Sequence, residues 1–213
     1  MTSQADAIRA GLALYGSARP LCVSEIGSQS CWLHASSPHM RNLYLSGPMG
    51  LASSVALGLA LTRPDERVLA ICGDGSLAMN LSSLVTIRNA CPANLCLLVI
   101  VNDTYEFTAS LPSPSASIDW VAAGAGLLGA DACRPLEGTS PDFVLRAERP
   151  VMLVAKVGAS DRPAPPIGLS PTEVRDTFRR ALAAAVNWPA PPQDLPDTEE
   201  DDEDEDDETE EAA

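Results

Sequence analysis

Apolar runs alternate along this chain with segments of helical periodicity. Buried strands are predicted where apolar residues follow one another, at residues 21–26, 68–72, 95–101 and 151–157. Helices are predicted from the periodicity and start signals of residues 3–15, 50–61, 77–89, 117–128, 140–147 and 172–186. The stretch 28–46 is rich in Ser, His and Asn, and it is predicted to be irregular.

Strands without polar alternation that are separated by helices are typical of a parallel sheet covered on both faces. The sequence therefore predicts an α/β fold of three layers, with a parallel sheet between two layers of helices. Hydrophobic residues make up 46% of the chain and aromatic residues only 4%, so the predicted core is aliphatic.

The negative charge is concentrated at one end of the chain. Residues 194–213 hold 14 of the 29 acidic residues and none of the 14 basic ones, although the net charge of the whole chain is −15. The remainder is almost neutral, which argues against a basic face for nucleic acid. A Pro-rich linker and an acidic run that cannot bury apolar surface make up residues 188–213, so we expect a folded domain over 1–187 and a disordered tail over 188–213. The tail either keeps the protein in solution or makes an electrostatic contact, with a basic partner or as a mimic of phosphate.

Cysteine usage and hydropathy predict a cytoplasmic protein. The six cysteines form no Cys-x-x-Cys pair, and a domain of this length does not need disulfides. No apolar run reaches the roughly 20 residues of a membrane span. The first residues lack the basic and apolar regions of a signal peptide.

Polar residues that suit a metal–diphosphate site follow two neighbouring predicted strands. Gly73-Asp74-Gly75-Ser76 comes after one strand, and Asn102 comes after the next, 28 residues beyond Asp74. The carboxyl ends of parallel strands lie at one edge, so the two side chains can meet on Mg²⁺, which prefers oxygen ligands and retains phosphate and water. The glycines allow a close backbone approach, and a helix that starts at Ser76 favours an anion. The alternative interpretation is a tight turn followed by a helix cap.

This pattern resembles the thiamin diphosphate enzymes, whose fingerprint is Gly-Asp-Gly followed at such a distance by Asn. Gly47-Pro48-Met49-Gly50 resembles the turn before a helix of small residues in that family, and the segments 25–28 and 102–105 resemble two of its loops. Over roughly residues 3–185 the chain is similar to the small β subunit of two-subunit sulfopyruvate and phosphonopyruvate decarboxylases.

The resemblance implies the diphosphate-binding domain of that family, with thiamin diphosphate and Mg²⁺ as cofactors. In that case Asp74, Asn102 and the Thr104 carbonyl would bind the metal, and Met49 would bend the cofactor from below. The full set of cofactor-binding residues implied by the resemblance is Gly27, Ser28, Gly47, Met49, Gly73, Asp74, Gly75, Ser76, Asn102, Thr104 and Tyr105.

The resemblance also implies the reaction and a partner. The reaction would be the non-oxidative decarboxylation of an anionic 2-oxo acid to an aldehyde. A separate α subunit, which carries the pyrimidine-binding domain, would supply the catalytic Glu, so the enzyme would be a hetero-oligomer and this chain alone would be inactive. Glu25 is not assigned that role, because it lies in a different part of the family pattern. Pro48 stands where the family usually has a small residue.

Three other interpretations compete with decarboxylation. Acyloin-forming carboligation shares the same chemistry up to the last step, and a noncatalytic scaffold subunit would account for Pro48 and the tail. A nicotinamide-binding domain is disfavoured, because no Gly-x-Gly-x-x-Gly follows the first strand.

A few polar residues near these motifs are further candidates. His34 and His39 are the only histidines and are candidates for proton transfer, although a structural role is the more common one for such residues. Arg41 is a candidate for binding an anionic substrate. Glu106 and Thr108, which follow the metal loop, are candidates for lining the pocket.

Overall fold

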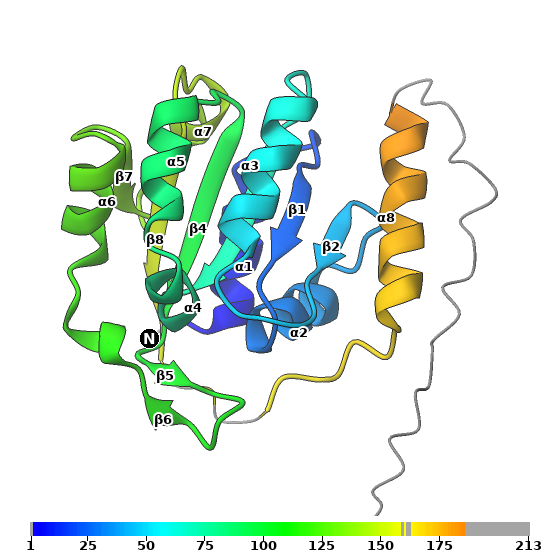
Figure 1. Ribbon diagram of the computed structural model, residues 1–213, viewed down its shortest axis with the longest axis horizontal. Helices are drawn as coiled ribbons and strands as arrows, with labels where there is room; N and C mark the ends of the chain where they lie inside the picture. The colour runs from blue at the N-terminus through cyan, green and yellow to red at the C-terminus, as the bar shows by residue number, and fades with distance from the viewer. Residues whose placement is uncertain (1, 159, 161–162, 186–213) are drawn as a thin grey trace, which may run out of the picture.

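Parallel strands form the central sheet of the computed structural model, which describes residues 2–158, 160 and 163–185 (Figure 1). Within these residues the sheet has six strands, all paired in parallel. In spatial order they are β2 (Asn42–Tyr44), β1 (Leu21–Ser24), β3 (Val68–Gly73), β4 (Leu95–Val101), β8 (Val151–Lys156) and β7 (Cys133–Pro135). The predicted parallel α/β fold is confirmed.

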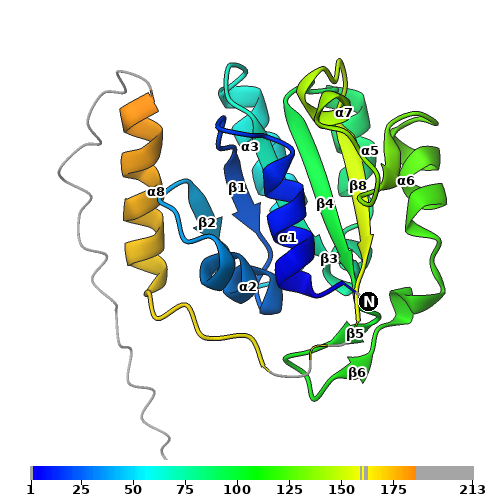
Figure 2. The same cartoon turned by 180° about the vertical axis from the view of Figure 1, so that it is seen from behind.

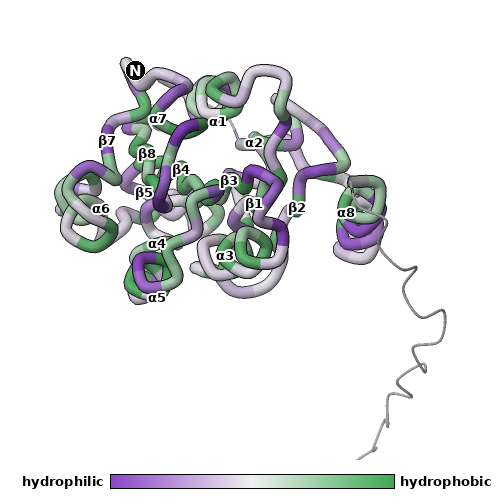
Figure 3. Tube along the Cα trace, turned by 90° about the horizontal axis from the view of Figure 1, so that it is seen from above, coloured by the Kyte–Doolittle hydropathy of each residue, from purple (hydrophilic) through white to green (hydrophobic). Residues whose placement is uncertain are grey.

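Helices cover both faces of the sheet, as Figures 1 and 2 show from opposite sides. One face carries α3 (Ala52–Thr62), α4 (Asp74–Met79), α5 (Ser83–Ala90) and α6 (Trp120–Leu128). The other carries α1 (Gln4–Ala13), α2 (Ser28–Ser36) and α7 (Pro141–Leu145). The last described helix, α8 (Pro171–Ala185), lies beyond β2 at the end of the sheet, which is clearest from above (Figure 3).

The core consists of two aliphatic layers, one on each side of the sheet. Along β3, Val68 and Ala70 face α3 and α5, whereas Leu69 and Ile71 face α1 and α2. Both sets are fully buried, because successive residues of a strand point to opposite faces and both faces are covered. This explains why the strands read as continuous apolar runs.

The structure corrects the prediction that residues 28–46 are irregular. They contain helix α2 and strand β2. The helix was missed because it has no polar face: its first six residues, serines included, are all buried. Their hydroxyls find partners inside the protein, as when Ser30 Oγ donates to the Glu25 carbonyl at 2.7 Å. A buried helix with satisfied serines therefore gives no amphipathic signal.

Other differences concern short elements. The helix predicted over 77–89 is two helices, α4 and α5, and the helix predicted over 117–128 is a 3-10 turn, η1 (Pro114–Ser117), followed by α6. A hairpin of β5 (Thr104–Tyr105) and β6 (Leu111–Pro112) was not predicted, nor was β7. Strands of two or three residues are too short to show a period of two.

The tail predicted over 188–213 lies outside the described residues. Within the part that is described, no helix combines the length and apolar character needed to cross a bilayer.

The burial of β4 leads to a stability prediction. Leu97 is 0% exposed, so Leu97→Ala should lower the free energy of unfolding by about 2–5 kcal/mol through lost contacts and a residual cavity. Leu61 is 53% exposed, and Leu61→Ala should change it by less than about 0.5 kcal/mol. Chemical denaturation of both variants measures the difference, and equal losses would contradict this account of the core.

Candidate functional site

The candidate site lies where the chain order of the strands reverses. From β1 the chain moves outward to β2, and then crosses back to β3, β4 and β8 on the other side. The loops at the carboxyl ends of β1 and β3 diverge at this point, which leaves a crevice where α/β proteins bind ligands. A cavity of about 280 Å³ opens there.

All eleven residues that the sequence singled out as cofactor-binding line this cavity. They come from four places: the end of β1, the turn 47–50, the end of β3 with the start of α4, and the end of β4 with the hairpin that follows it. The candidates Glu106 and Thr108 line it as well. Sequence reasoning missed three further lining residues, namely Ile26, Gln29 and Phe107.

Asp74 is the buried acid of the site, with 1% of its surface exposed. Its carboxylate accepts a hydrogen bond from Ser115 Oγ at 2.7 Å. Burial raises the pKa of the Asp74 carboxyl, and the bonds from Ser115 and from the backbone N–H groups of Gly75 and Asn102 lower it in part. Ser115 was not foreseen, because it lies 41 residues from Asp74 and belongs to no recognisable motif.

Asn102 lies beside Asp74, because β3 and β4 are paired up to Gly73 and Ile100. Asn102 is 7% exposed, and its Oδ1 accepts a hydrogen bond from the Thr104 N–H at 3.2 Å. This bond holds the Asn102 amide oxygen in a defined position relative to the start of the hairpin. A carboxylate, an amide oxygen and a carbonyl form an oxygen set that suits Mg²⁺. In the described part of the chain, no group of three or more His, Cys, Asp or Glu side chains could hold a metal ion.

Gly75 and Gly47 are required by the site for different reasons. A Cβ atom on Gly75 would lie 2.4 Å from the Tyr105 ring, so only glycine lets the hairpin close against α4. Gly47 has no such neighbour, but its φ of +101° is a conformation that L side chains rarely adopt. Pro48 is exposed and does not line the cavity, so the departure from the family pattern lies outside the pocket.

The N-terminus of α2 opens on the same cavity. Its N-cap is Gly27, so no side chain satisfies the first N–H groups of this nine-residue helix. Ser28 and Gln29 in its first turn both line the cavity, and Ser76 reaches it from α4. Free N–H groups, two hydroxyls and an amide form a set of donors suited to a phosphate group.

Glu25 supports the site from behind. Glu25 is 1% exposed, and its carboxylate accepts hydrogen bonds from the N–H groups of Leu51 and Ala52, at 3.1 and 3.3 Å. These groups begin α3, directly after the turn that carries Met49. Glu25 therefore anchors this turn against β1, which gives the residue a structural role.

The histidines and Arg41 are not brought to the cavity. His34 Nδ1 is 3.2 Å from the Tyr44 hydroxyl, on the part of α2 that runs away from the site. His39 precedes β2 at the amino end of the sheet, where its Nδ1 accepts a bond from the Arg41 N–H. Burial and the nearby charges of Arg19 and Arg41 lower the His39 pKa. The Arg41 guanidinium forms an ion pair with Glu66.

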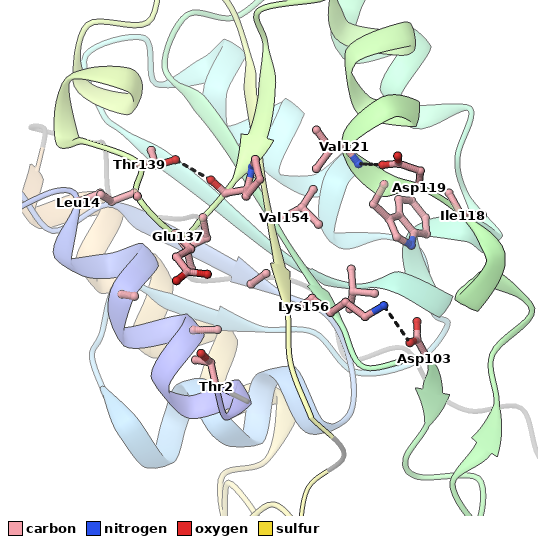
Figure 4. Close-up of a pocket in the computed structure, with 18 of the residues that line it drawn as sticks. Thr2, Leu14, Asp103, Ile118, Asp119, Val121, Glu137, Thr139, Val154 and Lys156 are labelled. Carbon is pink, nitrogen blue, oxygen red and sulfur yellow. Dashed lines mark hydrogen bonds and ion pairs between the residues drawn. The ribbon is translucent and has the colours of Figure 1, made fainter.

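A larger cavity, of about 650 Å³, lies beside β8 (Figure 4). Along its edge, Lys156 forms an ion pair with Asp103 at 3.9 Å. None of the eleven predicted cofactor-binding residues lines it. The candidate cofactor-binding residues therefore line the smaller of the two cavities.

With this geometry the chain is a thiamin diphosphate-binding domain. Residues 25–155 match the family described as thiamine pyrophosphate enzyme, C-terminal TPP binding domain, and the chain belongs to this family. The matched segment includes every residue of the cavity described above.

Curated relatives share about a third of the sequence. The chain is 34% identical to sulfopyruvate decarboxylase subunit beta of Methanocaldococcus jannaschii, over 77% of this chain and 89% of the relative. It is 33% identical to phosphonopyruvate decarboxylase of Streptomyces viridochromogenes, over 74% of this chain but only 41% of that protein.

Solved structures with low sequence identity share the fold. A thiamine diphosphate-dependent 4-hydroxybenzoylformate decarboxylase of Rhodococcus jostii superposes with a TM-score of 0.61 at 20% identity, covering 75% of this chain and 33% of that one. A 2-oxoglutarate:ferredoxin oxidoreductase of Magnetococcus marinus gives 0.57 at 13% identity, covering 89% and 87% of the two chains.

The environment of Glu25 leads to a pH prediction. Burial raises the pKa of its carboxyl above the ordinary value of 4.5. Such a group binds its proton more tightly in the folded chain, so it favours folding at low pH and loses this advantage as the pH rises through the folded pKa. The wild type should therefore lose stability relative to Glu25→Gln as the pH rises above 4.5.

Denaturant unfolding of both proteins across the pH range measures this difference. Glu148→Gln is the control, because Glu148 is exposed and its replacement should give no such trend. A difference between wild type and Glu25→Gln that is flat with pH, or that grows in the wild type's favour towards alkaline pH, would contradict the buried environment.

Proposed function

We propose that this chain is the β subunit of a heteromeric enzyme that decarboxylates a 2-oxo acid to an aldehyde with thiamin diphosphate and Mg²⁺. The observation that carries the proposal is the meeting of Asp74, Asn102 and Thr104 in one cavity with the donors of α2 and α4. The names of the relatives, which are decarboxylases, support the reaction type.

The chemistry of the lining residues suits the cofactor, because oxygen ligands and hydrogen-bond donors meet in one cavity. A Cβ atom on Gly73 would lie 2.9 Å from the Gln29 amide, so glycine at this position lets that donor approach the end of β3. In the proposal Asp74, the Asn102 amide oxygen and the Thr104 carbonyl hold Mg²⁺, and Ser28, Ser76 and Gly75 hold the diphosphate. Gly27, Gly47, Gly73 and Tyr105 complete the walls.

The chemical step belongs to the cofactor and the positioning belongs to the protein. When bound, thiamin diphosphate supplies a thiazolium that accepts the electron pair left by departing CO₂. Met49 is proposed to support the bent form of the cofactor, and Glu25 keeps the turn of Met49 in place. Ile26 and Phe107 supply an apolar part of the cavity wall.

The partner is proposed to complete the site. Among the described lining residues there are two carboxylates, and each accepts a hydrogen bond: Asp74 from Ser115, and Glu106 from Gln4 Nε2 at 2.7 Å. A separate α subunit would therefore supply the catalytic Glu. Exposed apolar side chains on the hairpin at the mouth, Phe107 at 64% and Leu111 at 53%, suit burial against such a partner.

The substrate is proposed to be an anionic 2-oxo acid such as sulfopyruvate or phosphonopyruvate, as the names of the relatives suggest. No Arg, Lys or His is among the described residues that line the cavity. The cations that recognise the second acid group must then come from the partner. His34, His39 and Arg41 receive no catalytic role in the proposal. The six free cysteines support a reducing, cytoplasmic location.

Binding of the cofactor tests the metal site. Asp74→Asn keeps the shape of the side chain but removes its charge, so Mg²⁺-dependent binding of thiamin diphosphate should weaken by about 100-fold or more. Asp103→Asn is the matched control: this carboxylate follows Asn102 but pairs with Lys156 outside the cavity, and binding should be retained. Calorimetry on the assembled complex measures both. Equal affinities of the two variants would sink the metal assignment.

Turnover tests the reaction and the role of Met49. The complex of this chain with its α subunit should release CO₂ and an aldehyde from sulfopyruvate or phosphonopyruvate. Met49→Ala should lower kcat by about tenfold or more with little change in KM, because misplacement affects the reacting geometry. Met40→Ala, at a site 42% exposed, should have no effect.

The products of the same assay separate the alternatives. An acyloin formed with an added acceptor aldehyde would favour carboligation. An assembled complex whose activity is the same with Asp74→Asn would favour a scaffold role for this chain.

A further inference from the structure

Helix α8 presents a row of arginines to solvent just before the acidic end of the chain. Val174, Phe178 and Ala181 of this helix are buried against the sheet, while Arg179 and Arg180 are exposed. The helix lies beyond β2 and so covers the edge of the sheet that would otherwise be open (Figure 3).

Arg179 and Arg180 line a groove between α8 and α3. It has a volume of about 570 Å³, and α3 supplies one wall and α8 the other. The lining residues are Leu59, Thr62, Arg63, Asp176, Arg179, Arg180, Leu182 and Ala183. Arg179 and Arg180 face Asp176, the one acid among the described lining residues, and neither arginine forms an ion pair with any residue that the structure describes.

The neighbouring arginines of α8 also repel one another. Arg175 and Arg179 are four residues apart and lie on the same side of the helix. Asp176 compensates only in part, because its carboxylate already pairs with Arg175 at 2.9 Å. The groove therefore retains an excess of positive charge, which favours an anionic occupant.

The chain carries a matching anion close by. Residues 199–208 are ten consecutive acidic residues, in a tail that starts directly after α8. The 13 residues between Ala185 and Glu199 can span up to about 45 Å, whereas Arg179 and Arg180 lie only about 8 Å back along the helix axis from Ala185. The acidic run can therefore return to the groove without strain, at the high effective concentration of a tethered segment.

We propose that the acidic run 199–208 docks in the arginine groove between α3 and α8 of its own chain. Docking neutralises the excess charge of α8 and holds the helix over the edge strand β2. The contact is electrostatic and partly exposed, so it weakens as salt screens it. It is independent of the proposed catalytic function, because the groove shares no residue with the candidate active site.

Hydrogen exchange of backbone amides in the full-length chain tests the proposal. One variant replaces the ten acidic residues 199–208 by their amides, and a second is Arg179→Ser with Arg180→Ser. At low salt, where the Debye length is about 30 Å, both variants should exchange the α8 amides about tenfold faster than the wild type. At about 1 M salt, where that length falls to about 3 Å, the difference should vanish.

Controls separate docking from a general effect of charge. Arg146→Ser with Arg149→Ser removes two exposed arginines elsewhere and should leave α8 unchanged. Adding the Arg179 and Arg180 substitutions to the amide tail should change the exchange of α8 much less than the same substitutions change it in the wild type, since both changes remove the same contact. Dilution should not alter the exchange of the wild type, because tail and groove belong to one chain.

Several outcomes would overturn the proposal. One is α8 exchange that is the same in the wild type and the amide-tail variant. Another is protection by the tail of residues 27–29 and 104–108 instead of α8, which would place the run over the cofactor cavity. A third is an effect that disappears on dilution, which would make a second copy of the chain the source of the tail.

Discussion

A carboxylate held out of water at the end of β3 is the feature on which the rest of the site depends. Removing Asp74 from solvent is unfavourable unless hydrogen bonds and a positive charge compensate. Ser115 supplies one bond, and the parallel register of β3 and β4 brings Asn102 alongside. The hairpin then closes over Gly75, the one residue type there that lets Tyr105 approach. In the proposed function Mg²⁺ is the missing positive charge.

The same sheet edge explains how far the sequence could anticipate the structure. Strands buried on both faces appear as plain apolar runs, so β1, β3, β4 and β8 were predicted, and the residues that follow three of them all reached one cavity. The place of the Gly-Asp-Gly-Ser segment could be predicted without knowledge of tertiary contacts, because the segment directly follows a strand and therefore lies at the carboxyl edge of the sheet.

What the sequence could not reveal depends on contacts between distant segments. Ser115 reaches Asp74 only after the hairpin folds, and Glu25 caps α3 across 26 residues of chain. The buried serines of α2 conceal a helix because their partners lie inside the protein. The positions of His34 and His39 likewise followed from the direction of α2 and β2 rather than from their nearness in sequence to Gly47.

The residues that line the cavity can account for cofactor binding but not for substrate recognition. This chain offers oxygen ligands, N–H donors and an apolar wall, and the described residues that line its cavity include no cationic side chain. The match covers 89% of the sulfopyruvate decarboxylase subunit beta but only 41% of the longer phosphonopyruvate decarboxylase. In the proposal this chain binds the diphosphate and the metal ion of the cofactor. Its partner recognises the substrate and supplies the catalytic Glu.

The most direct test is a crystal structure of the assembled complex with thiamin diphosphate and Mn²⁺ in place of Mg²⁺, with the metal located by its anomalous scattering. We expect one metal per chain, bonded to the Asp74 carboxylate, the Asn102 amide oxygen, the Thr104 carbonyl and the diphosphate. A metal found elsewhere, or a diphosphate bound without contact to Asp74 and Asn102, would contradict the account.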